Sequence, residues 1–155
     1  MKTHRYVIDL EWTGNVGQGT RSSSAYTREH RISAASKPPI AGSSDPSFRG
    51  DPARWNPEEL LVASLAACHK LWYLGLCAQA GVIVQRYVDR AEGVMLEEAS
   101  GAGQFESVTL RPRVVVSAHS DLDLAIALHD KAHEMCFIAR SVSFPVRTLP
   151  TVATA

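Results

Sequence analysis

The chain has 155 residues, of which 45% are apolar and 21% charged, and its 16 basic side chains balance its 16 acidic ones. A length near 150 residues predicts one domain, residues 1–155, that buries a core of its own. The zero net charge argues against the basic surface that nucleic-acid binding requires.

The N-terminal segment predicts neither export nor membrane insertion. Charged residues interrupt it at Lys2, Arg5, Asp9 and Glu11, so it lacks the apolar centre of a signal peptide. His69 and Lys70 interrupt the longest apolar stretch, so we expect no membrane-spanning helix. With three cysteines and no export signal, we expect a cytoplasmic protein whose thiols stay reduced.

The first half of the chain predicts a hairpin, a loop and a helix. Residues 4–12 and 24–34 alternate as strands do and flank a glycine-rich turn. Residues 36–55 are rich in Pro, Ser, Gly and Asp, which predicts a long loop. A helix over about 56–80 follows, with Asn56 as N-cap and Gly81 as its end. This helix is apolar nearly all round, so we expect it to be buried.

The second half predicts strands over 83–98 and 104–118, a helix over about 122–134 and a final strand within 141–148. Residues 150–155 are expected to form a loose tail. Because the strands come in hairpin pairs, the fold class is α+β with a largely antiparallel sheet.

The three cysteines differ in their surroundings. Cys77 follows Cys68 by nine residues on one helix, which puts the two on opposite faces and excludes a bridge between them. If a disulfide forms within the chain, Cys68 with Cys136 is the sensible pair. We expect Cys77 to be a core residue.

Two segments resemble the OsmC/Ohr family of organic hydroperoxide reductases. Asn56-Pro57-Glu58-Glu59-Leu60-Leu61 followed by Ala66-Ala67-Cys68-His69 looks like the family's first signature, and Ala132-His133-Glu134-Met135-Cys136 looks like its second. Both occur in order, and the expected element order also agrees. Phe137 stands where the family often has proline.

This resemblance implies an antioxidant, thiol-dependent peroxidase that reduces organic hydroperoxides to alcohols. Cys68 would be the peroxidatic cysteine and Cys136 the resolving one. Members need no metal and no bound organic cofactor, and lipoylated proteins or small dithiols recycle them. The family fold is an intertwined homodimer with long central helices and two active sites at the interface.

Cys68 needs a nearby cation, because an apolar helix raises a thiol's pKa. An arginine suits this role, and the chain offers Arg49, which we favour, and also Arg21, Arg28 and Arg54. The resemblance gives Glu58 the role of orienting that arginine. Glu58 and Cys68 lie about 15 Å apart along one helix, so we expect Glu58 to reach the partner chain's Cys68 where two antiparallel helices cross near residue 63.

Other interpretations remain open. Cys68 and Cys136 with His69 and His133 could be drawn as a zinc site, but adjacent helical residues chelate poorly, and both histidines suit structural or pocket-lining roles better. Trp72 and Phe137 are more often core residues than substrate contacts. Leu61, Leu65 and Leu71 would line an apolar pocket that favours bulky hydroperoxides over hydrogen peroxide. The alternatives are a thiol transferase or hydrolase with His69 or His133 as base, and a non-catalytic dimer that binds an apolar ligand.

Overall fold

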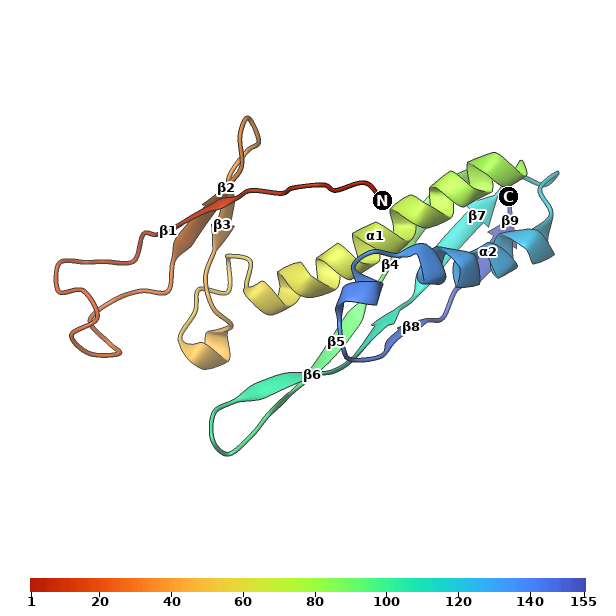
Figure 1. Ribbon diagram of the computed structural model, residues 1–155. Helices are drawn as coiled ribbons and strands as arrows, with labels where there is room; N and C mark the ends of the chain where they lie inside the picture. The colour runs from red at the N-terminus through yellow and green to blue at the C-terminus, as the bar shows by residue number, and fades with distance from the viewer. The chain divides into compact units, whose positions relative to one another are not determined.

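The computed structural model describes all residues, 1–155, and the chain divides into two compact units, residues 1–60 and 61–155 (Figure 1). The cysteines all lie in the second unit, whereas Arg49 and Glu58 lie in the first. A single domain over 1–155 therefore stays a prediction.

The first unit contains a three-stranded antiparallel sheet in the order β1-β2-β3, formed by Asp9–Trp12, His30–Ser33 and Ile40–Gly42. The strands expected over 4–12 and 24–34 do form, but they are shorter. The expectation of a featureless loop over 36–55 is wrong, because that segment holds β3 and the short 3₁₀ helix η1, Pro46–Phe48. The Asp45 carboxylate caps η1 by accepting a 2.7 Å hydrogen bond from the Ser47 N–H, an Asx interaction that composition alone conceals.

The long helix α1, Pro57–Ala80, begins and ends where the sequence predicts. At its start the Asn56 side chain accepts from the Glu59 N–H at 2.8 Å, and the Glu59 carboxylate accepts from the Asn56 N–H at 3.2 Å, which is a reciprocal capping box. At its end Gly81 adopts a φ of +75°, and the Val82 N–H donates to the Cys77 carbonyl at 2.9 Å.

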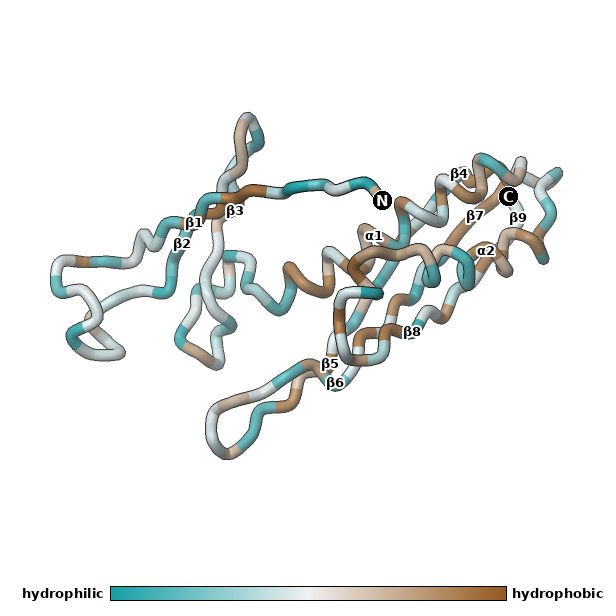
Figure 2. The backbone as a smooth tube through the Cα atoms, in the orientation of Figure 1, coloured by the Kyte–Doolittle hydropathy of each residue, from teal (hydrophilic) through white to brown (hydrophobic).

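The burial of α1 is narrower than its composition predicts. Its buried residues form one stripe at every fourth position: Leu65, His69, Tyr73 and Cys77. Figure 2 shows hydrophobic residues along much of α1, and Leu71 is 64% exposed. By length and composition α1 could cross a membrane despite His69 and Lys70, although the core helix of a soluble protein passes the same test. The stripe faces the core of the second unit and leaves apolar surface uncovered.

In place of the two long strands expected over 83–98 and 104–118, the structure has four shorter ones. These are β4 (Val84–Asp89), β5 (Glu92–Glu97), β6 (Gly103–Leu110) and β7 (Pro112–Val116). Strand β4 pairs with β7, and β5 with β6, both antiparallel. The expected strand over 104–118 is divided into β6 and β7 at Arg111. Pro112 has no N–H, and the Arg111 N–H donates to the Asp89 carboxylate at 2.7 Å instead of to a neighbouring strand.

The C-terminal residues are not a loose tail, so that expectation is wrong. β9, Thr151–Thr154, pairs in parallel with β7, and β8, Val146–Thr148, pairs in parallel with β6. The β-branched residues of β9 fit an extended pairing edge beside Val114 and Val116. Two three-stranded sheets result, in the orders β4-β7-β9 and β5-β6-β8.

The second helix, α2 (Leu122–Met135), packs against β8 and β9. Asp121 caps it as predicted, accepting from the Leu124 N–H at 2.9 Å. One core cluster joins α1, α2 and β7 through Tyr73, Cys77, Val82, Val114, Val116, Ala125 and Ala132. The predicted α+β class and largely antiparallel pairing are therefore confirmed, with two parallel pairs added.

Candidate functional site

The candidate site is built around two thiols that lie far apart in the sequence. Cys68 lies on α1 beside the buried stripe and is itself half-buried. Cys136 is the residue at which α2 ends, and it is only 1% exposed. Its N–H donates to the His133 carbonyl at 3.2 Å, and its own carbonyl accepts from the Arg140 N–H at 3.1 Å. These bonds fix the backbone of Cys136 between α2 and the 3₁₀ helix η2, Ala139–Ser141.

The Cys68 side chain lies close enough to Cys136 to act on its pKa, and both thiols are free. Burial and then the hydrogen-bonding Cys68 side chain raise the pKa of Cys136 well above its usual range. The Ala139 N–H donates to the Cys136 sulfur at 3.4 Å and acts in the opposite direction, because it stabilises a thiolate. The pair is thus a reduced dithiol in which Cys136 holds its proton at neutral pH.

A buried aromatic cluster lies next to Cys68 in the sequence. His69 Nε2 and His129 Nδ1 are 3.0 Å apart, and both side chains are 1% exposed. The Tyr73 ring stacks on the His129 ring with a centroid distance of 3.8 Å, and the Tyr73 hydroxyl donates to the Ala125 carbonyl at 2.9 Å. His69 therefore bonds to α2, and its remaining buried nitrogen, Nδ1, has no partner, so it does not serve Cys68 as a base.

Two further aromatic side chains follow the cysteines. Trp72 lies one turn after Cys68, Phe137 directly follows Cys136, and their rings meet edge to face at 5.5 Å. Phe137 is 66% exposed, so it is not the core residue that the sequence suggested. Leu65 is fully buried whereas Leu71 is exposed, so these two do not share the common pocket wall that we expected. Trp72 and Phe137 thus form an aromatic contact between residues that closely follow the two cysteines in sequence.

The third cysteine, Cys77, is a core residue, as predicted. It is 1% exposed and packs with Tyr73 and Val82. Burial raises its pKa, so it is a poor nucleophile.

The candidate arginines differ in the hydrogen bonds and ion pairs that their guanidinium groups already make. Arg28 donates to the carbonyls of Ser23 and Tyr26, and Arg54 pairs with Asp51 at 3.5 Å. The Arg49 guanidinium makes one hydrogen bond, to the Ser23 hydroxyl at 3.1 Å, and has no acidic partner. Arg21 is exposed. Arg49 thus keeps most of its donors free, and its pairing with Cys68 stays a prediction.

Glu58 lies in the first turn of α1. Its Oε2 atom is buried and has no hydrogen-bond partner, in contrast to Glu59, which closes the capping box. A buried carboxylate oxygen without a donor is costly, so a donor from outside these contacts would stabilise it.

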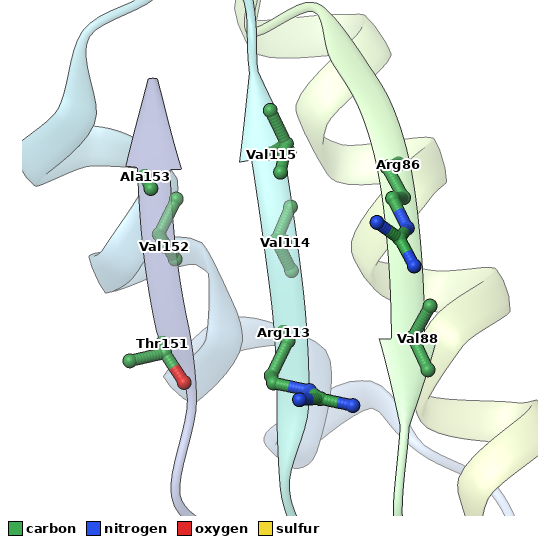
Figure 3. A pocket seen from close by; sticks show the side chains of 8 residues that line it. All are labelled: Arg86, Val88, Arg113, Val114, Val115, Thr151, Val152 and Ala153. Atoms are coloured by element: carbon green, nitrogen blue, oxygen red, sulfur yellow. The ribbon is translucent and has the colours of Figure 1, made fainter. Parts of the chain in front are cut away.

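One hollow lies on the sheet of β4, β7 and β9, and neither thiol lines it. It encloses about 350 Å³ and is lined by Arg86, Val88, Arg113, Val114, Val115, Thr151, Val152 and Ala153 (Figure 3). It contains no cysteine or histidine, so it offers no redox or acid–base group.

Sequence reasoning missed His129. Its position four residues after Ala125 and three before Ala132 on an amphipathic helix was the available signal, because these three positions form the buried face of α2.

The buried histidine pair predicts a loss of stability in acid. Burial, and then the charge of His133, lower the pKa of His69 to about 4, and burial and His69 lower that of His129 to about 3. Below pH 6.5 both histidines become protonated in the unfolded chain but stay neutral in the folded chain. The free energy of unfolding should therefore be highest above that pH and fall by roughly 1 kcal/mol per pH unit per histidine toward pH 4.

Urea unfolding at several pH values between neutral and pH 4 measures this loss. His129→Asn removes one titrating group and should show a smaller loss than the wild type. Equal slopes for both proteins would contradict the assignment.

Comparison with known proteins finds similarity to OsmC-like proteins. The family model described as OsmC-like protein matches residues 50–148, which include Glu58, Cys68 and Cys136. An OsmC-like protein of unknown function from Vibrio cholerae is 30% identical and superposes with a TM-score of 0.86, covering 96% of this chain and 100% of the other.

Two more distant proteins extend the comparison. An uncharacterized Bacillus subtilis protein, YmaD, is 23% identical, with 92% of this chain and 89% of that protein covered. An organic hydroperoxide resistance protein from Elizabethkingia anophelis, 19% identical, shares the fold with a TM-score of 0.68 and covers 100% of both chains.

Proposed function

Because this chain belongs to the OsmC-like protein family and holds two free thiols side by side, we propose that it is a thiol-dependent peroxidase that reduces organic hydroperoxides to alcohols. The neighbouring thiols of Cys68 and Cys136 are the observation that carries this proposal. The hydroperoxide resistance named for the Elizabethkingia anophelis protein, which shares this fold, supports the substrate class.

The reaction runs in two steps. The Cys68 thiolate attacks the outer peroxide oxygen, the O–O bond breaks, and the alkoxide leaves with a proton as the alcohol, so that Cys68 becomes a sulfenic acid. The Cys136 sulfur then attacks the Cys68 sulfur, a disulfide forms, and hydroxide leaves with a proton as water. The sum is dithiol plus hydroperoxide giving disulfide, alcohol and water, and an external dithiol restores both thiols.

The surroundings of Cys136 suit a thiol that reacts second. The charge of Cys68 is one cause that raises the pKa of Cys136, so conversion of Cys68 to a neutral sulfenic acid removes that cause. The Ala139 N–H then stabilises the thiolate that attacks. Cys136 therefore becomes a better nucleophile at the step that needs it.

Activation of Cys68 is assigned to Arg49 and Glu58. A guanidinium stabilises the thiolate and can also hold a peroxide oxygen, and Arg49 has donors to spare. Glu58, whose Oε2 lacks a donor, would accept from that guanidinium and orient it. The family resemblance supports these roles.

We also propose that the protein works as a homodimer. The first unit contributes no buried hydrophobic residue and exposes Tyr6, Val7, Ile8 and Leu10, while α1 is apolar beyond its buried stripe. A second copy lying along α1 would cover this surface. It would also carry a Glu58 to the other chain's Cys68, which one helix alone cannot do.

The remaining partners follow from the chemistry. The thiols supply the electrons, so the proposed reaction needs no bound metal or organic cofactor, and a small dithiol or a lipoylated protein would recycle the disulfide. The cytoplasm, where thiols are kept reduced, is the proposed location. A hydrolase with His69 as base fits less well, because His69 is engaged with His129.

The substrate class is tested by comparing peroxides. The Trp72 and Phe137 rings meet edge to face, and each residue closely follows a cysteine in sequence. If this aromatic pair contacts the substrate, the kcat/KM for cumene hydroperoxide should exceed that for hydrogen peroxide at least about tenfold. Consumption of each peroxide is followed with dithiothreitol as reductant, and Phe137→Ala should narrow the difference. Equal turnover of both peroxides by the wild type would contradict an apolar substrate site.

A further inference from the structure

We propose that the buried pair of His69 and His129 is a positioning device that holds the sulfurs of Cys68 and Cys136 within reach of each other. The bond between the two helices that carry the thiols is taken directly from the structure, and only its consequence for turnover rests on the proposed function. His69 and His129 are positioning residues here, because neither touches a reacting atom.

The pair ties together the two helices that carry the thiols. His69 adjoins Cys68 on α1, and His129 precedes Cys136 by about two helical turns, so that it lies on the same side of α2 as the cysteine. The Nε2–Nδ1 hydrogen bond of 3.0 Å joins the helices at this point. A slide of α2 along α1 by one residue would break the bond and shift Cys136 by about 1.5 Å.

Tyr73 strengthens this connection one turn further along α1. Its ring lies 3.8 Å from the His129 ring and nearly parallel to it, with an interplanar angle of 12°. Its hydroxyl donates to the Ala125 carbonyl of α2 at 2.9 Å. The stack restricts the rotation of the His129 ring, so its Nδ1 stays directed at His69.

Packing alone explains this cluster poorly. Each neutral imidazole has one donor and one acceptor nitrogen, and the outer nitrogens, His69 Nδ1 and His129 Nε2, are buried without partners. Two unpaired polar atoms in a core cost free energy that an apolar pair of similar volume would avoid. What the imidazoles provide instead is one defined register between α1 and α2, since only one alignment forms the bond.

The experiment measures the redox equilibrium of the two thiols without peroxide. The protein is equilibrated in buffers of reduced and oxidised glutathione, and the fraction of Cys68–Cys136 cross-linked peptide is quantified by mass spectrometry. Oxidised glutathione accepts the two electrons and becomes two thiols. The position of this equilibrium reports how well the fold holds the sulfurs together, a property that general stability does not set.

His129→Phe keeps the stack on Tyr73 but loses the hydrogen bond, and it should weaken the disulfide at least about tenfold, which makes its potential about 30 mV less negative. His129→Asn places a polar atom where Nδ1 lies and should stay close to the wild type. The same comparison is made at the other partner of the bond, where His69→Leu loses the bond and His69→Gln places a polar atom where Nε2 lies. Val114→Ala, in the same core cluster but not bonded to the pair, is the control for lost packing.

A wild-type potential in His129→Phe, or an equal shift in Val114→Ala, would overturn the proposal. If the bond-losing variants do not fold, His129→Asn and His69→Gln decide, because the proposal requires wild-type potentials in both. Because no peroxide is used, these results stand apart from the proposed function. A wild type that fails to reduce hydroperoxides while the potentials shift as expected would overturn only the peroxidase assignment.

Discussion

Replacing Cys68 with serine should abolish hydroperoxide reduction, with a loss of at least about a thousandfold in turnover, because a serine hydroxyl does not ionise at neutral pH to attack a peroxide. Cys136→Ser should behave differently. It keeps the attacking thiol, so without added dithiol it should consume about one equivalent of cumene hydroperoxide and then stop with Cys68 as a sulfenic acid, where the wild type stops as the disulfide. Peroxide consumption is measured together with trapping of the sulfenic acid by dimedone.

Cys77→Ala is the matched control, because Cys77 is buried in the core and should not affect turnover. Multiple turnover of peroxide by Cys136→Ser with dithiothreitol would mean that the dithiol reduces the sulfenic acid directly, so that Cys136 is not the resolving thiol. A thiol transferase or hydrolase would instead consume no peroxide catalytically. A protein that keeps its function in Cys68→Ser would instead be a non-catalytic binder of an apolar ligand.

Two inactive variants should restore each other if Glu58 serves the partner's Cys68. In a mixed dimer of Glu58→Gln and Cys68→Ser chains, one site combines an intact Cys68 with an intact Glu58 from the other chain, and the second site has neither. Random mixing makes half of the dimers mixed, so about a quarter of the wild-type activity should return. The chains are mixed after unfolding and refolding together, and each variant alone is measured in parallel.

No recovery on mixing, with mixed dimers shown to form, would place Glu58 within its own chain's site or outside catalysis.

The role of Arg49 is tested by substitution. Arg49→Ala should slow the reaction of Cys68 with peroxide about ten- to a hundredfold, the worth of a hydrogen bond to a charged group, while Arg21→Ala should not. An equal effect of both substitutions would remove Arg49 from the site.

Much of the fold could be predicted from the sequence, because its helix signals are local. The Asn56–Glu59 capping box and Gly81 define α1, and Asp121 defines α2. The strands were harder. The break at Pro112 and the pairing of β9 with β7 depend on partners far along the chain, which local patterns do not reveal.

The candidate site could be predicted only in part. Motifs identified Cys68 and Cys136, which lie close enough for Cys68 to act on the pKa of Cys136, and their catalytic roles stay predictions. His129 was missed because its role depends on His69 on another helix, and Phe137 was assigned to the core although it is exposed. A residue's neighbours across the fold, rather than its own type, decide such roles.

Oxidation of the reduced protein by cumene hydroperoxide tests the central claim most directly. After digestion without reductant, mass spectrometry should find a peptide in which Cys68 is cross-linked to Cys136, formed in proportion to the peroxide added, with Cys77 still free. Peroxide consumed without that cross-link, or a cross-link joining Cys77 instead, would contradict the account.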